Sequence, residues 1–180
     1  YNPGPYTLNG NSNIFHALSV SGGPSEKGSF RSIDLIRDKK IIETIDLYDT
    51  FIFGRSSFGT RLRSGDLIFI NSVQNIISLS GGFKRPGSYE LKVDEPLSTA
   101  LSFGNGFSAY ADLNNIKLER IIEGKIENLR IVKASEFDDI ISKDADTIFI
   151  RAFPFRAIEI SGAVLNPGTY LMNEGDNVND

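Results

Sequence analysis

The chain of 180 residues contains no cysteine and no tryptophan, and it has a single histidine, His16. Without cysteine it can form neither a disulfide nor a thiolate metal site, although this absence suits oxidising and reducing compartments alike. A Ser-His-Asp triad or a transition-metal centre would have to use His16. That residue lies in a segment with helical spacing, and its counterpart in the repeat described below is Thr99. We therefore expect a surface histidine, no metal and no cofactor.

Long hydrophobic runs and basic runs are also missing. Apolar stretches such as 67–70 have the length of a strand and fall far short of the roughly 20 residues of a membrane-spanning helix. The 19 Lys and Arg residues against 23 Asp and Glu residues give a net charge of −4. Because nucleic-acid affinity comes largely from Lys and Arg meeting phosphates, we expect no nucleic-acid partner.

The motifs of common enzyme classes are absent as well. Residues 104–109 contain two glycines, but they follow a predicted helix and lack the Lys-Ser/Thr of a phosphate loop, which favours a helix C-cap. Neighbouring acids such as Asp138 and Asp139 have the chemistry of a glycosidase pair, but chance pairs are expected among 23 acids. Solvated or capping roles are favoured for them, and we expect that the chain is not an enzyme.

The sequence does contain a repeated turn, Pro-Gly-x-Tyr. It occurs at Pro3, Pro86 and Pro167, so the second copy lies 83 positions after the first and the third lies 81 positions after the second. Around the second and third copies, apolar residues alternate with polar ones, which is the period of a half-buried strand. The turns therefore predict strand, tight turn and strand, and their spacing predicts duplicated units.

The elements between the turns follow the same order twice. In the first unit the pattern predicts a helix that one of the residues 11–13 caps and Gly22-Gly23 ends, strands at 29–37 and 41–45, a short helix capped by Asp46, and a strand at 67–70. In the second unit it predicts a helix with Pro96 in its first turn, strands around 116–118 and at 126–131, a short helix capped by Ser135, and a strand at 147–150.

Single residues also correspond between the units. Arg37 matches Arg120 at an offset of 83, whereas Asp66 matches Asp146 at an offset of 80. Three residues are thus lost in between, and we assign the loss to the loop 54–60, which has no counterpart. A shared offset at many positions is the mark of a duplication.

The fold class that follows is α+β: tandem β-grasp-like domains, each a small mixed sheet with one main helix. We predict a first repeat at 1–73, a second at 74–153, and the strand-turn-strand start of a third at 154–180. The first repeat lacks the strand before its Pro-Gly turn, which leaves a sheet edge for a preceding or neighbouring segment to cover. The chain does not begin with Met, and we expect an excised fragment whose signal peptide or lipid anchor lies outside it.

Two groups of residues are candidates for ligand binding. Three arginines surround the unmatched loop together with an aromatic residue, as Arg55, Phe58, Arg61 and Arg63. They could bind an anionic ligand or a neighbouring subunit, or the loop could simply be solvated. The tyrosines of the turns, Tyr89 and Tyr170, could stack on sugar rings, although a tyrosine at the start of a strand more often packs on a core.

These residues resemble a known family. The soluble-ligand-binding β-grasp repeat called SLBB is similar to the chain at 20–23, 77–91 and 160–170. The version of this repeat in bacterial outer-membrane polysaccharide export proteins is similar to it at 31–37, 45–49 and 61–70. The resemblance covers nearly the whole chain, and the tandem arrangement favours export proteins over relatives with a single repeat.

The resemblance implies a location in the periplasm, attached to the outer membrane through parts of the protein that this sequence lacks. It implies a role in exporting capsule or exopolysaccharide as part of a homo-oligomeric ring. The implied partners are the polysaccharide and an inner-membrane polysaccharide co-polymerase, and the family offers no catalytic motif. The alternative is a module that binds a glycan or another soluble ligand without a transport role.

Overall fold

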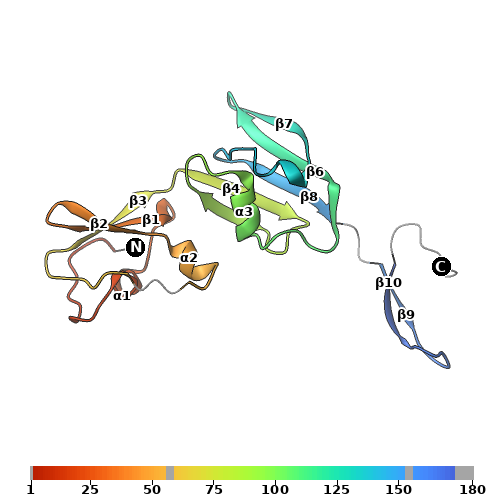
Figure 1. Ribbon diagram of the computed structural model, residues 1–180, viewed down its shortest axis with the longest axis horizontal. Helices are drawn as coiled ribbons and strands as arrows, with labels where there is room; N and C mark the ends of the chain where they lie inside the picture. Colours follow the sequence, from red (N-terminus) through yellow and green to blue (C-terminus); the bar gives the residue numbers. More distant parts are fainter. Residues whose placement is uncertain (1, 56–58, 153–155, 173–180) are drawn as a thin grey trace.

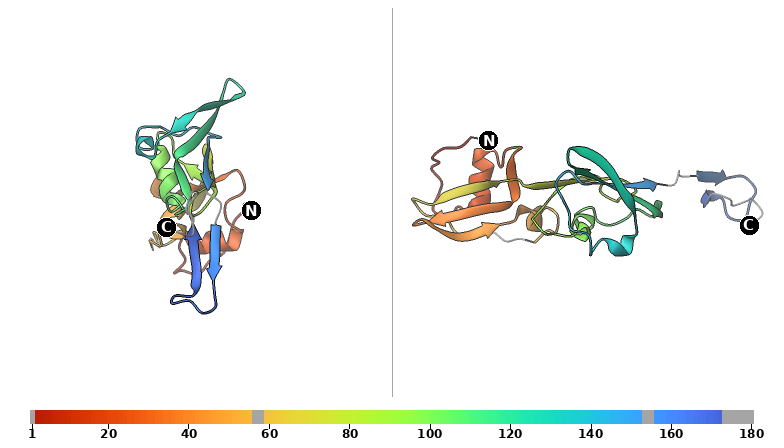
Figure 2. Two further views of the ribbon diagram at one scale, coloured as in Figure 1. Left: turned by 90° about the vertical axis from the view of Figure 1, so that its right-hand side faces the viewer. Right: turned by 90° about the horizontal axis from the view of Figure 1, so that it is seen from above.

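The computed structural model describes residues 2–55, 59–152 and 156–172. Within these stretches, three sheets follow one another along the long axis of the molecule (Figure 1). Figure 2 shows the molecule end-on, where the units overlap, and from above, where the row of units is seen again. The architecture is α+β, as the sequence predicts.

The first unit is a three-stranded antiparallel sheet with one main helix packed on it. Its strand order is β2-β1-β3. The main helix begins where Asn13 accepts a hydrogen bond from the backbone of His16, and it ends at Gly22, whose φ of 84° is left-handed. The elements are α1 (Ile14–Ser21), β1 (Gly28–Arg37), β2 (Lys40–Ile45), α2 (Leu47–Phe51) and β3 (Leu67–Ser72).

The second unit is a five-stranded mixed sheet. Its strand order is β5-β4-β8-β6-β7, and β4 and β8 run parallel in the middle of the sheet. One main helix again covers the core, as predicted. The elements are β4 (Asn75–Gly81), β5 (Gly87–Leu91), α3 (Leu97–Phe103), β6 (Ala111–Ile122), β7 (Lys125–Val132), a 3₁₀ turn (Ala134–Glu136) and β8 (Thr147–Ala152).

The two sheets share their register. Ile33 on β1 faces Ile70 on β3, just as Ile116 on β6 faces Ile150 on β8. The strands β2, β1 and β3 thus correspond to β7, β6 and β8. Among the described residues, the first sheet contains no strands that correspond to β4 and β5, and all its pairs are antiparallel.

The register divides the predicted three-residue loss into two changes. Arg37 pairs with Lys40, whereas the corresponding Arg120 pairs with Glu127, so the offset rises from 83 to 87 within the hairpin. Because the offset is 80 at β3 and β8, the second unit has a longer hairpin and a shorter connection after it. The net loss of three residues is thus a gain of four in the hairpin and a loss of seven in the connection that contains the loop 54–60.

The predicted short helix capped by Ser135 is wrong. The chain makes only one 3₁₀ turn there, and Phe137 then enters the core with 1% exposure. The carbonyls of Phe137 and Ile140 accept hydrogen bonds from the first backbone N–H groups of α3. The first backbone N–H groups of a helix have no partners within the helix. The segment 137–140 provides carbonyl acceptors for those of α3, and it does not form a helix of its own. Pro96 is the N-cap of α3, one position before the first turn in which it was predicted.

The cores of the two units differ in size. The cluster of the second unit contains thirteen buried apolar residues, whereas the cluster of the first contains six, counted over the described residues. Four of the thirteen come from the β4–β5 hairpin or the turn inside it: Ile77, Leu79, Phe83 and Leu91. The part of the first unit that the structure describes contains no strand pair of this kind.

The third sheet is a lone hairpin. β9 (Arg156–Ile160) and β10 (Gly168–Met172) pair with each other and, within the described residues, with no other strand. The rest of the predicted third repeat, 173–180, lies outside the described residues. Over the part of the chain that is described, no helix has the length and apolar character to cross a membrane.

Candidate functional site

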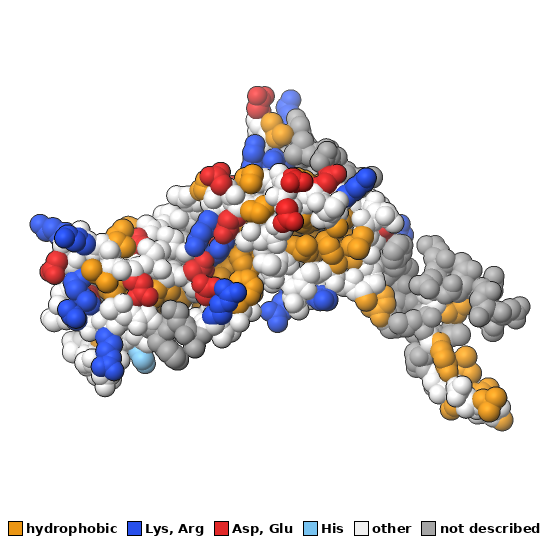
Figure 3. Space-filling model, viewed as in Figure 1, with side chains coloured by type: hydrophobic (Ala, Val, Ile, Leu, Met, Phe, Trp, Pro, Cys, Tyr) orange, Lys and Arg blue, Asp and Glu red, His pale blue; other side chains and the backbone are white. Residues whose placement is uncertain are grey.

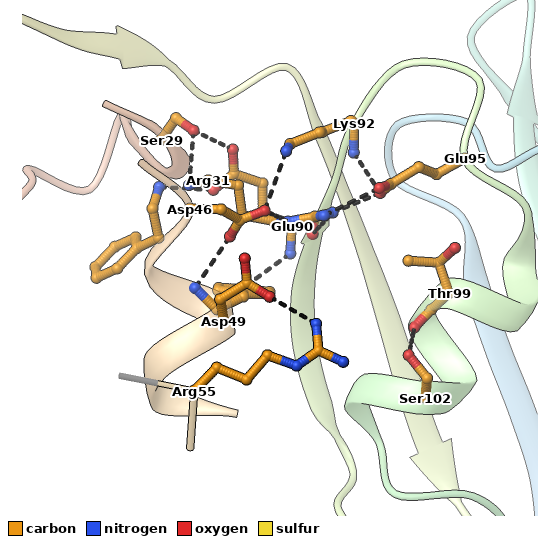
Figure 4. Close-up of polar contacts among 12 residues, drawn as sticks. Ser29, Arg31, Asp46, Asp49, Arg55, Glu90, Lys92, Glu95, Thr99 and Ser102 are labelled. Atoms are coloured by element: carbon orange, nitrogen blue, oxygen red, sulfur yellow. Dashed lines mark hydrogen bonds and ion pairs between the residues drawn. The ribbon is translucent and has the colours of Figure 1, made fainter. Parts of the chain in front are cut away.

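The junction between the first two units is built around Arg31, a charged residue in the middle of β1. Arg31 is only 6% exposed. Its Nε donates to Asp46 Oδ2 at 3.0 Å, and its two terminal nitrogens donate to the two carboxylate oxygens of Glu95, one of them at 2.9 Å. One of those nitrogens also donates to the backbone carbonyl of Glu90 at 3.2 Å. The guanidinium thus links strand β1 of one unit to the β5–α3 segment of the next (Figure 4).

The carboxylates around Arg31 have further partners. Lys92 lies with its Nζ 3.1 Å from Asp46 Oδ2, and its backbone N–H donates to Glu95 at 2.8 Å. The side chain of Glu90 reaches back to the first unit, where it accepts hydrogen bonds from the Ser29 hydroxyl and from a backbone N–H of β1 at 2.7 Å. Each acidic group at the junction is therefore neutralised or hydrogen-bonded, as burial requires.

An aromatic cluster completes the junction beneath the charges. Tyr48 of α2 meets Phe103 of α3 edge-on, with ring centroids 5.0 Å apart, and Phe53 lies 5.8 Å from the same ring. The Arg31 guanidinium stands over Phe103 at 4.9 Å and over Tyr48 at 5.4 Å, a cation–π arrangement. The Tyr48 hydroxyl accepts the backbone N–H of Glu90 at 2.9 Å.

The pKa values of Arg31 and Tyr48 at the junction are both raised. Burial by itself lowers the pKa of Arg31, but the hydrogen bond with Glu95 and the charge of Asp46 outweigh it and raise that pKa above its usual value. Burial likewise raises the pKa of the Tyr48 phenol. Both groups keep their protons at physiological pH, so neither is a general base. The arrangement links the two units.

A shallow cleft of about 180 Å³ lies beside the junction, lined in part by Phe30, Tyr48, Ile76 and Glu90. Ligand pockets for drug-sized molecules are typically about 300–1,000 Å³. The cleft is smaller than that, and the Glu90 carboxylate that lines it already accepts a hydrogen bond from Ser29. No group of His, Cys, Asp or Glu residues suited to a metal ion occurs among the described residues.

The predicted arginines lie at the edge of the first unit and do not form one cluster of contacts. Arg55 pairs with Asp49 at 3.2 Å and covers the ring of Phe53 at 5.0 Å. Arg61 and Arg63 are exposed, and each belongs to the connection that leads into β3. Phe58 lies outside the described residues. Ligand binding by these arginines stays a prediction.

The tyrosines of the three turns share one structural role. Tyr89 donates its hydroxyl to the carbonyl of Arg85 at 2.8 Å, and Tyr170 donates to Asn166 at the same distance. Tyr6 makes the same contact within its own turn. In each case the acceptor precedes the proline, so the hydroxyl closes the turn. Tyr89 also packs 6.1 Å from Phe103, whereas Tyr170 is 41% exposed.

A second buried ion pair is repeated in both units. Arg37 makes two hydrogen bonds of 2.7 Å with Asp66, and Arg120 makes two of 2.7 Å with Asp146. Arg37 lowers the pKa of the Asp66 carboxyl through these hydrogen bonds. The repeat predicted both pairs as corresponding residues, and their shared geometry shows that they fasten β1 and β6 to the turns that lead into β3 and β8.

The junction residues themselves were not predicted as a site. The counterpart of Arg31 in the second unit is Asn114, so the arginine is not part of what the duplication repeats. One signal in the sequence could have indicated this site. Arg31 is a charged residue between apolar positions of a predicted strand, and the other copy has no charge at that position. His16, by contrast, is exposed on α1 as expected and caps it by accepting the backbone N–H of Asn13.

The chain was also compared with known proteins. Residues 76–128 match the family model of the SLBB domain. The match runs from β4 into β7 and includes the hairpin, α3 and β6. No curated protein matches the chain. The second unit therefore contains a segment similar to the SLBB domain, and the first unit repeats the register of β6, β7 and β8.

Proposed function

We propose that the chain is the periplasmic segment of a polysaccharide export protein, in which tandem SLBB units form part of the wall of an oligomeric ring. The ring would be a conduit for capsule or exopolysaccharide, anchored at the outer membrane by other parts of the protein. The observation that supports this most is the junction at Arg31. The wall of a ring must be rigid. The buried and fully paired guanidinium of Arg31 holds the two units in one relative orientation.

The mechanism would be passive. No nucleophile, metal cluster or proton-transfer group stands out among the described residues, and charges of both signs are interspersed over the first unit and the junction (Figure 3). A surface of this kind is well hydrated and holds a charged or neutral polymer only weakly. Transport would then be driven by synthesis elsewhere, with an inner-membrane co-polymerase as the partner.

The proposal is tested by the native mass of the full-length protein in detergent, with negative-stain images of the same sample. We expect closed rings of identical subunits. A monodisperse monomer under these conditions would remove the basis for a conduit.

A second candidate function is binding of an acidic glycan or another anionic ligand. It is favoured by the exposed arginines Arg61 and Arg63 beside β3 and by the SLBB match. Calorimetric titration with acidic and neutral oligosaccharides tests it. We expect heat with the acidic ones, lost in the Arg61→Ala/Arg63→Ala variant and retained in Lys39→Ala/Lys40→Ala, which removes two exposed cations from the tip of the β1–β2 hairpin. Absence of heat with every oligosaccharide would refute it.

A further inference from the structure

The sequence contains two Asn-Gly pairs, Asn9-Gly10 and Asn105-Gly106. In such a pair the asparagine side chain is open to attack by its own main chain, because the backbone nitrogen of glycine has no Cβ beside it. Both asparagines are exposed, so exposure does not distinguish them. The hydrogen bonds around the two pairs do differ, and they decide which pair can react.

The carboxamide of Asn9 is activated by two hydrogen-bond donors. Its Oδ1 accepts the backbone N–H of Asn11 at 3.0 Å and the hydroxyl of Ser12 at 3.2 Å. The first of these bonds makes an Asx turn, which folds the side chain back over the following peptide bond. Negative charge develops on Oδ1 when the carboxamide carbon is attacked. The two donors therefore act as an oxyanion hole does.

The nitrogen that would attack is unhindered. Within the stretches that the structure describes, the N–H of Gly10 has no hydrogen-bond partner, and a Cβ built on Gly10 would meet no atom within 4 Å. Attack on Asn9 therefore breaks no hydrogen bond of this nitrogen and meets no steric obstacle. The turn also holds the two reacting groups next to each other, which lowers the entropic cost of the reaction.

The second pair is blocked by the end of α3. Asn105 follows this helix with a left-handed φ of 58°. The N–H of Gly106 donates to the carbonyl of Leu101 at 2.9 Å, and the carbonyl of Gly106 accepts the backbone N–H of Lys84 at 3.0 Å. The nitrogen that would attack thus belongs to the hydrogen bonds that end the helix. The reaction at Asn105 would first have to break them.

We propose that Asn9 is a self-modifying site, which converts to isoaspartate and aspartate in the folded protein while Asn105 stays intact. The nitrogen of Gly10 gives its proton to a base in the solvent and forms a bond to Cγ of Asn9. The bond from Cγ to the amide nitrogen breaks, and that nitrogen takes up a proton and leaves as ammonia. Water then opens the resulting succinimide. Opening at the former main-chain carbonyl gives isoaspartate, and opening at Cγ gives aspartate.

The turn at Asn9 also supports the connection that carries two candidate ligand-binding arginines. Its carbonyl accepts the backbone N–H of Ser12 at 3.1 Å, and the carbonyl of Ser12 accepts the N–H of Leu62 at 2.9 Å. Leu62 stands between Arg61 and Arg63. Isoaspartate adds a methylene group to the main chain and converts the carbonyl of residue 9 into a free carboxylate. The modification therefore disrupts the support of Leu62 and adds a negative charge to the loop before α1.

Peptide mapping by mass spectrometry of the whole chain, fresh and after incubation at mildly alkaline pH, measures the reaction at both pairs. We expect Asn9 to convert at least about tenfold faster than Asn105, because only the second pair must break hydrogen bonds and only the first has donors to Oδ1. In concentrated urea the two rates should become similar, which controls for the local sequences. Equal rates in the folded protein would overturn the proposal.

Two substitutions test the activation of the carboxamide. Ser12→Ala removes one donor to Oδ1, and we expect the conversion of Asn9 to slow several-fold. Asn11→Ala is the matched control, because it leaves the backbone N–H that donates to Oδ1 in place, and the rate should not change. Loosening of the turn by itself would speed the reaction. A rate in Ser12→Ala that is unchanged or raised would therefore overturn the role of the donors.

Hydrogen exchange of the Leu62 amide tests the structural consequence. This amide should exchange several-fold faster in incubated protein than in fresh protein. Asn9→Gln should show no such change against its own fresh sample, because a glutamine side chain does not form the succinimide. Unchanged exchange at Leu62 in protein that carries isoaspartate would refute the link to the arginines. None of these results depends on whether the full-length protein forms rings, so this proposal and the proposed function fail independently.

Discussion

Replacing Arg31 by alanine should separate the unfolding of the two units. The change removes four hydrogen bonds and leaves Asp46 and Glu95 facing one another across the junction. Breaking one partner of a buried ion pair costs about 3–5 kcal/mol. The two carboxylates are 15% and 23% exposed, and Lys92 still pairs with Asp46, so part of their hydration and charge compensation is recovered. We therefore expect the free energy of unfolding to fall by about 2–4 kcal/mol, which covers the lower part of that range and extends just below it.

Differential scanning calorimetry of the whole chain measures this effect. The first unit, with the smaller core, should melt separately in the variant, with its midpoint lowered by on the order of 10 °C or more for a unit of this size. Arg55→Ala is the matched control, because it removes an ion pair at the same junction that is 71% and 46% exposed. Exposed pairs contribute about 0–1 kcal/mol. If both variants melt alike, the junction does not stabilise the tandem and our reasoning is wrong.

Two further predictions concern acid and backbone strain. Since hydrogen bonding to Arg37 lowers the pKa of Asp66 in the folded state, this pair contributes stability above the unfolded pKa of about 3.9 and loses it as the pH falls through the folded value. In urea unfolding at several pH values, Asp66→Asn should thus be destabilising at pH 7 and nearly neutral at strongly acidic pH; an equal deficit at both would contradict the assigned cause. Gly81→Ala should lower the free energy of unfolding by about 2 kcal/mol more than Gly124→Ala does. Both glycines have φ near 80°, but a Cβ at Gly81 would lie 1.9 Å from the carbonyl oxygen of Ile150, whereas a Cβ at Gly124 would meet no atom within 4 Å. Equal losses in chemical denaturation would refute that comparison.

Local signals in the sequence were sufficient for most elements of the fold. Asn13 and Gly22 bound α1 because a side-chain cap and a left-handed glycine act within a few residues of the chain. The turn at Asp38 and Lys39 sets the β1–β2 hairpin in the same way, with both residues at positive φ. The duplication then extended these assignments from one unit to the other and matched Arg37 with Arg120 and Asp66 with Asp146, although it did not predict that they form ion pairs.

The junction could not be predicted in this way. Arg31 meets Asp46 at a separation of 15 in the sequence and Glu95 at a separation of 64, and no periodicity relates the three. The short helix predicted after Ser135 failed for a related reason, because the carbonyls of Phe137 and Ile140 are needed by α3, which lies well before them in the chain. Contacts of this length are set by the packing of whole elements, which overrides local preference. Ligand-binding residues are hard to predict for another reason. What an exposed arginine binds depends on a partner molecule that the sequence does not describe.

The connection between the units also determines how such a chain can grow. β3 ends at Ser72 and β4 begins at Asn75, so two residues join the last strand of one unit to the first strand of the next. The chain thus passes from sheet to sheet along the long axis without turning back (Figure 1). A chain with one more repeat would become longer by one fixed step and no wider. The number of repeats then determines the length of the molecule. Gain or loss of whole repeats changes that length and leaves the cross-section the same.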